Sequence, residues 1–207
     1  TDGLFSSQSE IDGWHDQSAL GGVPIPGDIK YMDLTGDGIV DQKDRAPIGV
    51  NANPKMVYGL RAQVNYKWFD LNVFVNGVTN RNVYLSGFGR WSNRDNFTEY
   101  MKEAWTPENQ DAAYPRLGNN STNYILSDYW IENGSYLRVK NLELGFTIPE
   151  SVTSRINASS IRLYVNGLNP FAFDSLPNDD FDPETSSGSN INYPIIKSYN
   201  FGVSMKF

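Results

Sequence analysis

The last nine residues of the chain alternate strictly between apolar side chains and small or polar ones. The apolar set is Tyr199, Phe201, Val203, Met205 and Phe207, and the other set is Asn200, Gly202, Ser204 and Lys206. Because successive side chains of a β-strand point to opposite faces, this pattern predicts a strand with one apolar and one polar face. Soluble domains usually end in a frayed polar terminus, so we expect the terminal aromatic residue to have a use of its own.

Four earlier segments show the same period of two, namely 56–66, 69–79, 136–148 and 161–166. The first two flank Lys67 and Trp68, which predicts a hairpin with a tight turn. The apolar positions of the third segment change phase near Lys140 and Asn141. Either a β-bulge at that point or a change from protein-covered to lipid-facing surroundings would produce such a shift.

The composition excludes several classes of function. The 207 residues include no cysteine, which rules out disulfides, thiol chemistry and cysteine-ligated zinc. The single histidine, His15, argues against histidine triads and histidine metal sites. A net charge of −7 argues against nucleic acid as a partner, because phosphate binding requires a basic patch. The high tyrosine, asparagine and glycine content favours an all-β chain with aromatic surfaces that suit carbohydrate.

The connections between the expected strands alternate in length. The connections at 67–68 and 149–159 are short, whereas 1–55, 80–135 and 170–195 are long. Outer-membrane barrels have brief periplasmic turns and long outer loops, and each strand needs only about 9–11 alternating residues. No apolar run approaches the ~18 residues of a transmembrane helix. We therefore predict an all-β fold of antiparallel up-and-down strands from a transmembrane β-barrel, with a periplasmic C-terminus.

This prediction divides the chain into two regions. Residues 1–55 form a surface loop region, and residues 56–207 carry the barrel strands together with the long loops 80–135 and 170–195. Within the first of these loops, 97–105 is the one segment with a helical pattern, preceded by a capping Asn96 and followed by Pro107.

Residues 33–44 fit the twelve-residue calcium loop. Side-chain oxygens fall at loop positions 1, 3, 5, 9 and 12, a backbone carbonyl is available at position 7, and Gly38 permits the turn at position 6. The expected ligands are Asp33, Thr35, Asp37, Ile39, Asp41 and Asp44. The flanking residues are extended rather than helical, which favours a structural Ca²⁺ clamp over a switch. The alternative interpretation is a solvated turn rich in aspartate and glycine.

Other polar and aromatic clusters carry weaker signals. Trp91, Tyr124 and Trp130 are candidates for stacking on a ligand, but such residues also pack loop domains or form the aromatic girdle of a barrel. Asp182 and Glu184 belong to an acidic run that resembles paired glycosidase carboxylates, yet nothing nearby would raise the pKa of one of them. An acidic loop is the better interpretation. The sequence contains no catalytic constellation, and we predict no enzyme activity.

Several stretches together resemble the SusC/RagA-type TonB-dependent outer-membrane transporters of Bacteroidetes. The segment 3–11 is similar to the family's segment upstream of the calcium-like loop, and 26–41 (PGDIKYMDLTGDGIVD) is similar to that loop. The segment 134–149 (GSYLRVKNLELGFTIP) is similar to the strand that most marks the family. The stretches 161–171 and 198–207 resemble its last two strands. The resemblance covers nearly the whole chain and indicates the C-terminal part of such a protein.

The resemblance implies a 22-stranded barrel around a plug, which imports glycan fragments or peptides across the outer membrane. It also implies a SusD-type lipoprotein as a lid, energy from TonB, and recognition of Phe207 by the barrel-assembly machinery. Five strands cannot close a barrel, and an open sheet in lipid leaves two edges unpaired. The expected partners therefore include the remainder of the barrel and the plug, together with outer-membrane lipid.

A second hypothesis remains open at this point. A soluble all-β carbohydrate-binding or adhesion module, stabilised by one calcium loop, would also show alternating strands. Such a module would bury its apolar strand faces, whereas a barrel wall would leave them exposed to lipid.

Overall fold

The computed structural model of the protein describes residues 1–49, 52–85, 99–118, 121–176, 181–184 and 195–207. The chain forms two compact units. The loop unit is built from the described residues of Thr1–Val50 and Tyr84–Glu132. The sheet unit is built from those of Asn51–Val83, Asn133–Thr185 and Tyr193–Phe207. The sequence-based division at residue 55 assigned the whole insertion 80–135 to the strand region, whereas most of it groups with the first fifty residues.

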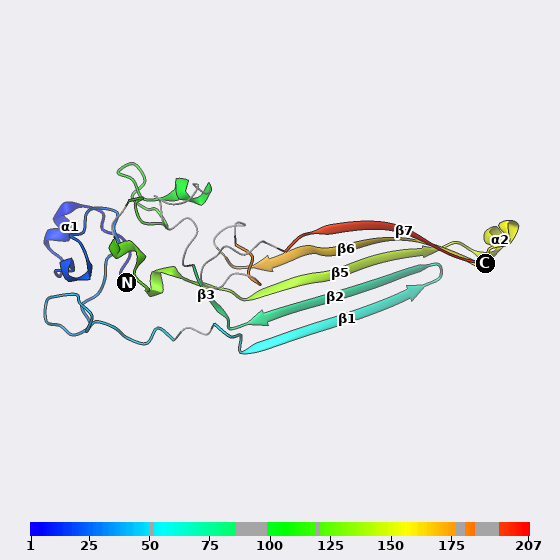
Figure 1. Ribbon diagram of the computed structural model, residues 1–207, viewed down its shortest axis with the longest axis horizontal. Helices are drawn as coiled ribbons and strands as arrows, with labels where there is room; N and C mark the ends of the chain where they lie inside the picture. Colours follow the sequence, from blue (N-terminus) through cyan, green and yellow to red (C-terminus); the bar gives the residue numbers. More distant parts are fainter. Residues whose placement is uncertain (50–51, 86–98, 119–120, 177–180, 185–194) are drawn as a thin grey trace. The chain divides into compact units, whose positions relative to one another are not determined.

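Five antiparallel strands make up the sheet unit (Figure 1). Their order in the sheet is β1 (Met56–Tyr66), β2 (Phe69–Thr79), β5 (Tyr136–Thr147), β6 (Ser160–Asp174) and β7 (Ser198–Lys206). Sequential strands of this sheet are neighbours, as in an up-and-down barrel wall. All five strands predicted from the alternation are therefore confirmed, and each has at least nine residues, the length needed to cross a bilayer.

Both short connections lie at one end of the sheet. Phe69, at the start of β2, pairs with Phe146 of β5 next to the Lys67–Trp68 turn, in which Lys67 has a φ of 56°. Ser160 of β6 pairs with Lys206 at the end of β7. The short helices α2 (Glu150–Thr153) and η5 (Ser154–Ile156) connect β5 to β6 at this same end (Figure 1). The long segments of the chain consequently leave the strands at the opposite end.

The predicted phase change in β5 is a β-bulge. The register shifts between Val139 and Asn141: Lys140 is the extra residue relative to β2, whereas β6 has two residues, Asn169 and Pro170, opposite Lys140. Beyond the bulge β6 continues to Asp174, where the sequence predicted a loop from residue 170 onwards. That boundary was wrong because Phe171 and Phe173 resume the alternation and pair with Val139 and Leu137.

The loop unit has little regular secondary structure. It contains helix α1 (Gln8–Asp12) and four 3₁₀ helices, η1 (Ser18–Leu20), η2 (Glu99–Glu103), η3 (Ser121–Tyr124) and η4 (Asp128–Trp130). Two further short strands, β3 (Asn82–Tyr84) and β4 (Ile131–Asn133), pair with each other. The helix predicted over 97–105 is only the five-residue η2, and residues 97 and 98 lie outside the described part of the chain. No helix among the described residues is long and apolar enough to cross a membrane.

A buried carboxylate organises the core of the loop unit. Asp28 is completely buried and accepts hydrogen bonds from Arg116 Nε (2.7 Å), Asn123 Nδ2 (2.9 Å) and the Ile25 amide (2.9 Å). Asn123 in turn accepts a hydrogen bond from the Ile29 amide (2.9 Å). Except for the local bond from Ile25, these contacts join segments more than 85 residues apart in the sequence. Loops without a sheet or long helices need such side-chain partners for their buried backbone groups.

Candidate functional site

One face of the five-stranded sheet is apolar from edge to edge. Paired residues of neighbouring strands share a face, and the register aligns one apolar row across all five strands. That row runs through Leu60 and Val64 of β1, Leu71 and Val73 of β2, Leu142 and Leu144 of β5, Leu163 and Val165 of β6, and Phe201 and Val203 of β7. We call this surface the apolar face.

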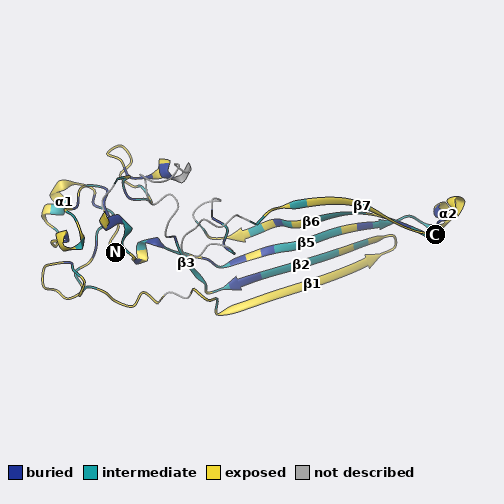
Figure 2. Ribbon diagram, viewed as in Figure 1, coloured by how far each residue is buried: buried dark blue, intermediate teal, exposed yellow. Residues whose placement is uncertain are grey.

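The apolar face is exposed in the structure. Phe201 is 84% exposed, Leu60 is 67% exposed and Val203 is 61% exposed. Figure 2 shows that β1 is exposed along its whole length. Soluble proteins rarely leave a contiguous apolar surface of this extent uncovered, because its removal from water is favourable. A surface of this kind requires lipid or protein as its neighbour.

The opposite face, here called the polar face, carries charged and amide side chains. Arg162 of β6 binds Asp70 of β2 through Nε (2.9 Å) and Nη2 (2.5 Å), and its Nη2 also binds Glu143 of β5 (2.7 Å). Asn166 donates to Asn141 on the neighbouring strand at 2.6 Å. Such cross-strand networks belong to an environment that contains water or other polar groups rather than lipid.

Gly145 of β5 makes room for the ion pair between Arg162 of β6 and Asp70 of β2. It pairs with Asp70 on one side and Tyr164 on the other, so it lies between the strands that the Arg162–Asp70 ion pair joins. A Cβ atom at this position would collide with both the Asp70 carboxylate and the Arg162 guanidinium. The missing side chain therefore leaves room for the ion pair to pass over β5.

The aspartate loop at residues 33–44 belongs to the loop unit and is held closed by its own carboxylates. Asp33 accepts hydrogen bonds from the amides of Gly36 (2.6 Å) and Gly38 (2.7 Å). Asp44 at the other end accepts them from the amides of Leu34 (2.9 Å) and Asp41 (2.8 Å). The φ angles of the two glycines are 76° and 89°, a region that favours glycine and permits the sharp turn.

These hydrogen bonds keep the aspartates ionised. Backbone N–H groups, first that of Asp41 and then that of Thr35, lower the pKa of Asp44 to about 2. The Gly38 amide is the largest cause that lowers the pKa of Asp33. Ionised oxygens at both ends of a glycine-bearing turn fit the chemistry of a calcium loop. Among the described residues, however, no three acidic or histidine side chains converge as a metal site requires.

The other predicted ligands in the aspartate loop are more exposed. Asp37 accepts a hydrogen bond from the Ile39 amide (3.1 Å), and its carboxylate lies 3.9 Å from Lys43 Nζ. Asp41 accepts one from the Lys43 amide (2.6 Å), and Thr35 donates its hydroxyl to Asp33 (3.2 Å). The loop therefore keeps its shape through hydrogen bonds at its two ends, while Asp37 is free to reorient toward a cation.

The three aromatic candidates for ligand contact have different surroundings. Trp130 is buried in the core of the loop unit with Ile29 and Val40, and its indole N–H donates to the Asn123 carbonyl (2.9 Å), so its ring is a packing element. Tyr124 is half-buried and its hydroxyl donates to the Gly118 carbonyl (2.5 Å). Trp91 lies outside the described residues. Phe207, predicted as an assembly signal, is 87% exposed.

The sequence and the fold both resemble known transporters. TonB-dependent receptor P3 of Formosa agariphila is 31% identical over 204 residues, which is 92% of this chain and 20% of that protein. TonB-dependent receptor SusC of Bacteroides thetaiotaomicron is 28% identical over 188 residues, which is 90% of this chain and 18% of SusC. The chain belongs to the SusC/RagA-type TonB-dependent transporters.

The structural comparison agrees on the fold. A structure of the RagAB peptide importer in its open-open state aligns with a TM-score of 0.64 and 22% sequence identity, over 86% of this chain and 20% of that one. No family model matches the chain. The chain thus spans about one fifth of the length of the relatives it matches. The resemblance stated from the sequence is confirmed, and so is the all-β fold of barrel strands.

Sequence reasoning missed the residues that cross-link the polar face. Asp70, Glu143 and Arg162 each occupy a polar position of an alternating strand, which is the signal that marks their face. Their partners depend on the register between strands far apart in the sequence, and only the structure supplies that register.

Proposed function

We propose that the chain forms part of the wall of an outer-membrane importer, with the apolar face toward lipid and the polar face toward the passage. The observation that carries this proposal is the separation of the two faces across five strands. An exposed apolar row on one side and cross-strand ion pairs on the other match the lipid-facing and lumen-facing sides of a barrel. The soluble-module hypothesis requires a cover for the apolar face, and the described residues provide none.

The two sheet edges, β1 and β7, determine which partners the proposal needs. Each edge strand has only one neighbour in the described sheet, and unpaired backbone groups are not tolerated in lipid. Further strands must therefore pair with both edges and close the barrel. In this account the short connections and the C-terminus face the periplasm, and the long segments face the cell surface. A plug, the TonB complex and a SusD-type lipoprotein complete the importer.

Oligopeptides are one proposed substrate class, in line with the peptide importer whose fold the chain resembles, and glycan fragments, which the family resemblance implies, are the other. The test uses the protein as its gene encodes it, expressed with its lipoprotein partner in outer membranes. Uptake of labelled oligopeptides and oligosaccharides is measured with and without a protonophore. We expect energy-dependent uptake of one of the two classes. A protein found in the soluble fraction, with no uptake of either class, would overturn the proposal.

We further propose that the aspartate loop binds one structural Ca²⁺. Support comes from the ligand spacing, the positive φ of Gly36 and Gly38, and the ionised ends of the loop. Bound Ca²⁺ would draw Asp37 and Asp41 toward the centre in place of their contacts with Lys43. Ca²⁺ would then stabilise the surface loop without taking part in transport chemistry.

Isothermal titration with Ca²⁺ tests this second proposal. Asp37→Asn removes one ligand without touching the hydrogen bonds of Asp33 and Asp44, and we expect it to abolish the heat of binding. Asp111→Asn is the matched control because Asp111 is exposed and lies outside the aspartate loop. Heat equal to that of dilution for the parent protein would contradict the calcium site.

A further inference from the structure

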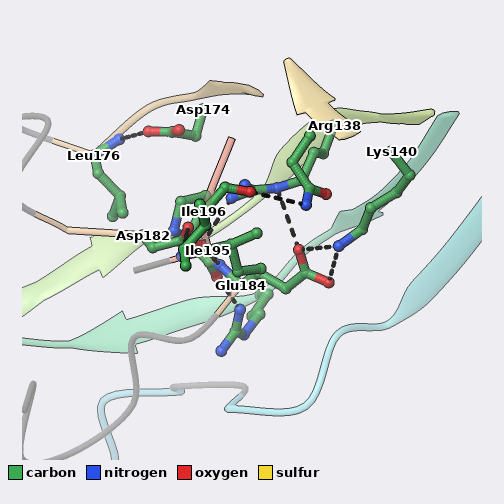
Figure 3. A network of polar contacts seen from close by, with 11 residues as sticks. Arg138, Lys140, Asp174, Leu176, Asp182, Glu184, Ile195 and Ile196 are labelled. Carbon is green, nitrogen blue, oxygen red and sulfur yellow. Dashed lines mark hydrogen bonds and ion pairs between the residues drawn. The ribbon is translucent and has the colours of Figure 1, made fainter. Parts of the chain in front are cut away.

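A short acidic segment between β6 and β7 is bound by basic side chains of the sheet unit. Residues 181–184, with the sequence Phe-Asp-Pro-Glu, are here called the acidic strap. Phe181 and Pro183 are buried, and the two carboxylates reach the basic side chains of β5 (Figure 3). The sequence suggested only an acidic loop for this stretch. In the structure it is an anchored element of the sheet unit.

Arg138 is the centre of this attachment. Its side chain stands on the polar face of β5 and is only 3% exposed. Its Nη2 donates to Asp182 at 2.8 Å, and its Nε lies 3.2 Å from a Glu184 carboxylate oxygen (Figure 3). One guanidinium therefore holds both acidic residues of the strap, in a fixed geometry that a single flexible ammonium would not impose.

Two further cations complete the cluster. Lys140, the bulged residue of β5, places Nζ at 2.7 Å and 2.6 Å from the two carboxylate oxygens of Glu184. Arg81, which follows β2, donates to the Pro183 carbonyl. Asp182 also accepts the Ile195 amide at 3.2 Å, which ties the strap to the residues that lead into β7.

The ion pairs of this cluster fix the position of the acidic strap more than they stabilise the folded protein. Removing charges from water is costly, so a buried ion cluster adds little net stability unless every group is paired. In return it specifies one arrangement, because a strap shifted along the polar face would still cover Arg138 but leave it without its ionic partners. Lys140 lies two residues after Arg138, and alternate side chains of a strand point to the same face, so both can reach the same cluster.

We propose that the acidic strap is a built-in constriction of the passage, held against the polar face by Arg81, Arg138 and Lys140. The inference rests on the proposed function, in which the polar face lines the passage. An element fixed on that face narrows the space available to a substrate. Loss of the ion pairs would free the strap, expose the polar face beneath it and admit larger substrates.

Single-cysteine labelling tests the position of the strap in the complete protein, whose chain here has no cysteine of its own. Ala172 pairs with Arg138 and shares its face, so Ala172→Cys reports on the surface next to the strap. Asn200→Cys on β7 reports on the same polar face away from Arg138. With a membrane-impermeant maleimide, we expect slow labelling at 172 and fast labelling at 200. Asp182→Asn with Glu184→Gln should raise the rate at 172 about tenfold and leave 200 unchanged.

A double-mutant cycle tests whether the ion pairs hold the strap. Lys140→Met and Glu184→Gln break the same contact, so the double variant should label at position 172 no faster than Glu184→Gln alone. Lys197→Met is the control, because Lys197 is exposed and makes no ion pair with a described residue. Additive effects of the two substitutions on the labelling rate at position 172 would overturn the role of the ion pair. The comparison holds even if each variant folds less well.

Uptake of a substrate length series tests the constriction itself. We expect the Asp182→Asn/Glu184→Gln variant to import longer substrates than the parent, while the shortest substrate enters at an unchanged rate. Fast labelling at 172 in the parent, or an unchanged length limit in the variant, would overturn the strap proposal. Absence of labelling at both 172 and 200 in every variant would instead contradict the proposed function, because the polar face would then not meet water.

Discussion

The two units of this chain obtain their structure in opposite ways. The sheet unit takes its order from a repeated period of two and a continuous ladder of backbone hydrogen bonds, and it leaves an apolar face exposed. The loop unit has few helices and strands and instead buries polar side chains such as Asp28 and Asn123, which form hydrogen bonds with each other and with backbone amides. The comparison teaches that alternating strands can form a sheet with one face for lipid. An irregular unit in water depends instead on individual hydrogen bonds between its buried side chains.

Asp28→Ala should have the largest effect, and it should be confined to the loop unit. The substitution leaves Arg116 and Asn123 without their shared acceptor in the core, which costs about 3 kcal/mol of the free energy of unfolding. Hydrogen exchange at the Ile29 amide measures this loss. Asp111→Ala, at an exposed position, is the control. Equal destabilisation of the sheet amides would contradict the separation into two units.

Arginine substitutions on the two faces of β7 should differ in their effect on the free energy of unfolding, and this is the next largest expected effect. Phe201→Arg puts a charge on the apolar face, midway along β7, and should destabilise the protein in a bilayer by about 2–4 kcal/mol. Asn200→Arg places the same charge one residue away on the polar face, and we expect a change below about 1 kcal/mol. Unfolding titrations in lipid vesicles compare the two. Similar values for both variants would argue against lipid on the apolar face.

Gly145→Ala should have a smaller effect, within the polar face alone. The new methyl group displaces the Arg162–Asp70 ion pair, and the flexible ends of both side chains can move, so we expect a loss of about 1 kcal/mol. Gly59→Ala on β1 is the matched control, because the nearest atom to its Cβ would be an ordinary 3.6 Å contact. Equal tolerance of both substitutions would show that the ion pair needs no such space.

Acid should cause the smallest of these losses of stability, and it should do so in the loop unit. The Lys30 ammonium beside Glu10 lowers the pKa of that carboxyl to about 2, and the Asp41 amide does the same for Asp44. Because these folded-state values lie below the usual 4.5 and 3.8, the stabilisation is complete above pH 5 and disappears as the pH falls through 2. Carboxyl-carbon NMR titration should give midpoints near 2. Midpoints at the usual values would contradict these contacts, and Asp44→Asn should remove the Asp44 titration alone.

The sequence predicted the sheet unit far better than the loop unit. All five strands follow from a local period of two, and a bulge near Lys140 was one of two interpretations of the phase change in β5. The end of β6 was missed because Asn169 and Pro170 look like the start of a loop, although pairing with β5 resumes at Phe171. The helix at 97–105 failed because a short amphipathic pattern does not outweigh tertiary contacts.

The polar contacts were beyond sequence reasoning for a common physical reason. Asp28 and Arg116 are 88 residues apart, and Arg138 and Asp182 are 44 apart. Each pair depends on how distant segments pack, and neither shows a periodic signal. The aspartate loop differs, because its expected ligands lie within twelve consecutive residues, and its Ca²⁺ site stays a prediction.

The most direct test of the central claim is the water and lipid access of neighbouring residues on β1 and β7. Spin labels are attached to single cysteines at Leu60 and Arg61, and at Val203 and Ser204, in the complete protein reconstituted in lipid bilayers. We predict that labels at 60 and 203 collide mainly with oxygen dissolved in lipid, whereas labels at 61 and 204 collide mainly with a water-soluble nickel chelate. Equal access of the nickel chelate to both members of each pair would contradict the assignment of the apolar face to the membrane.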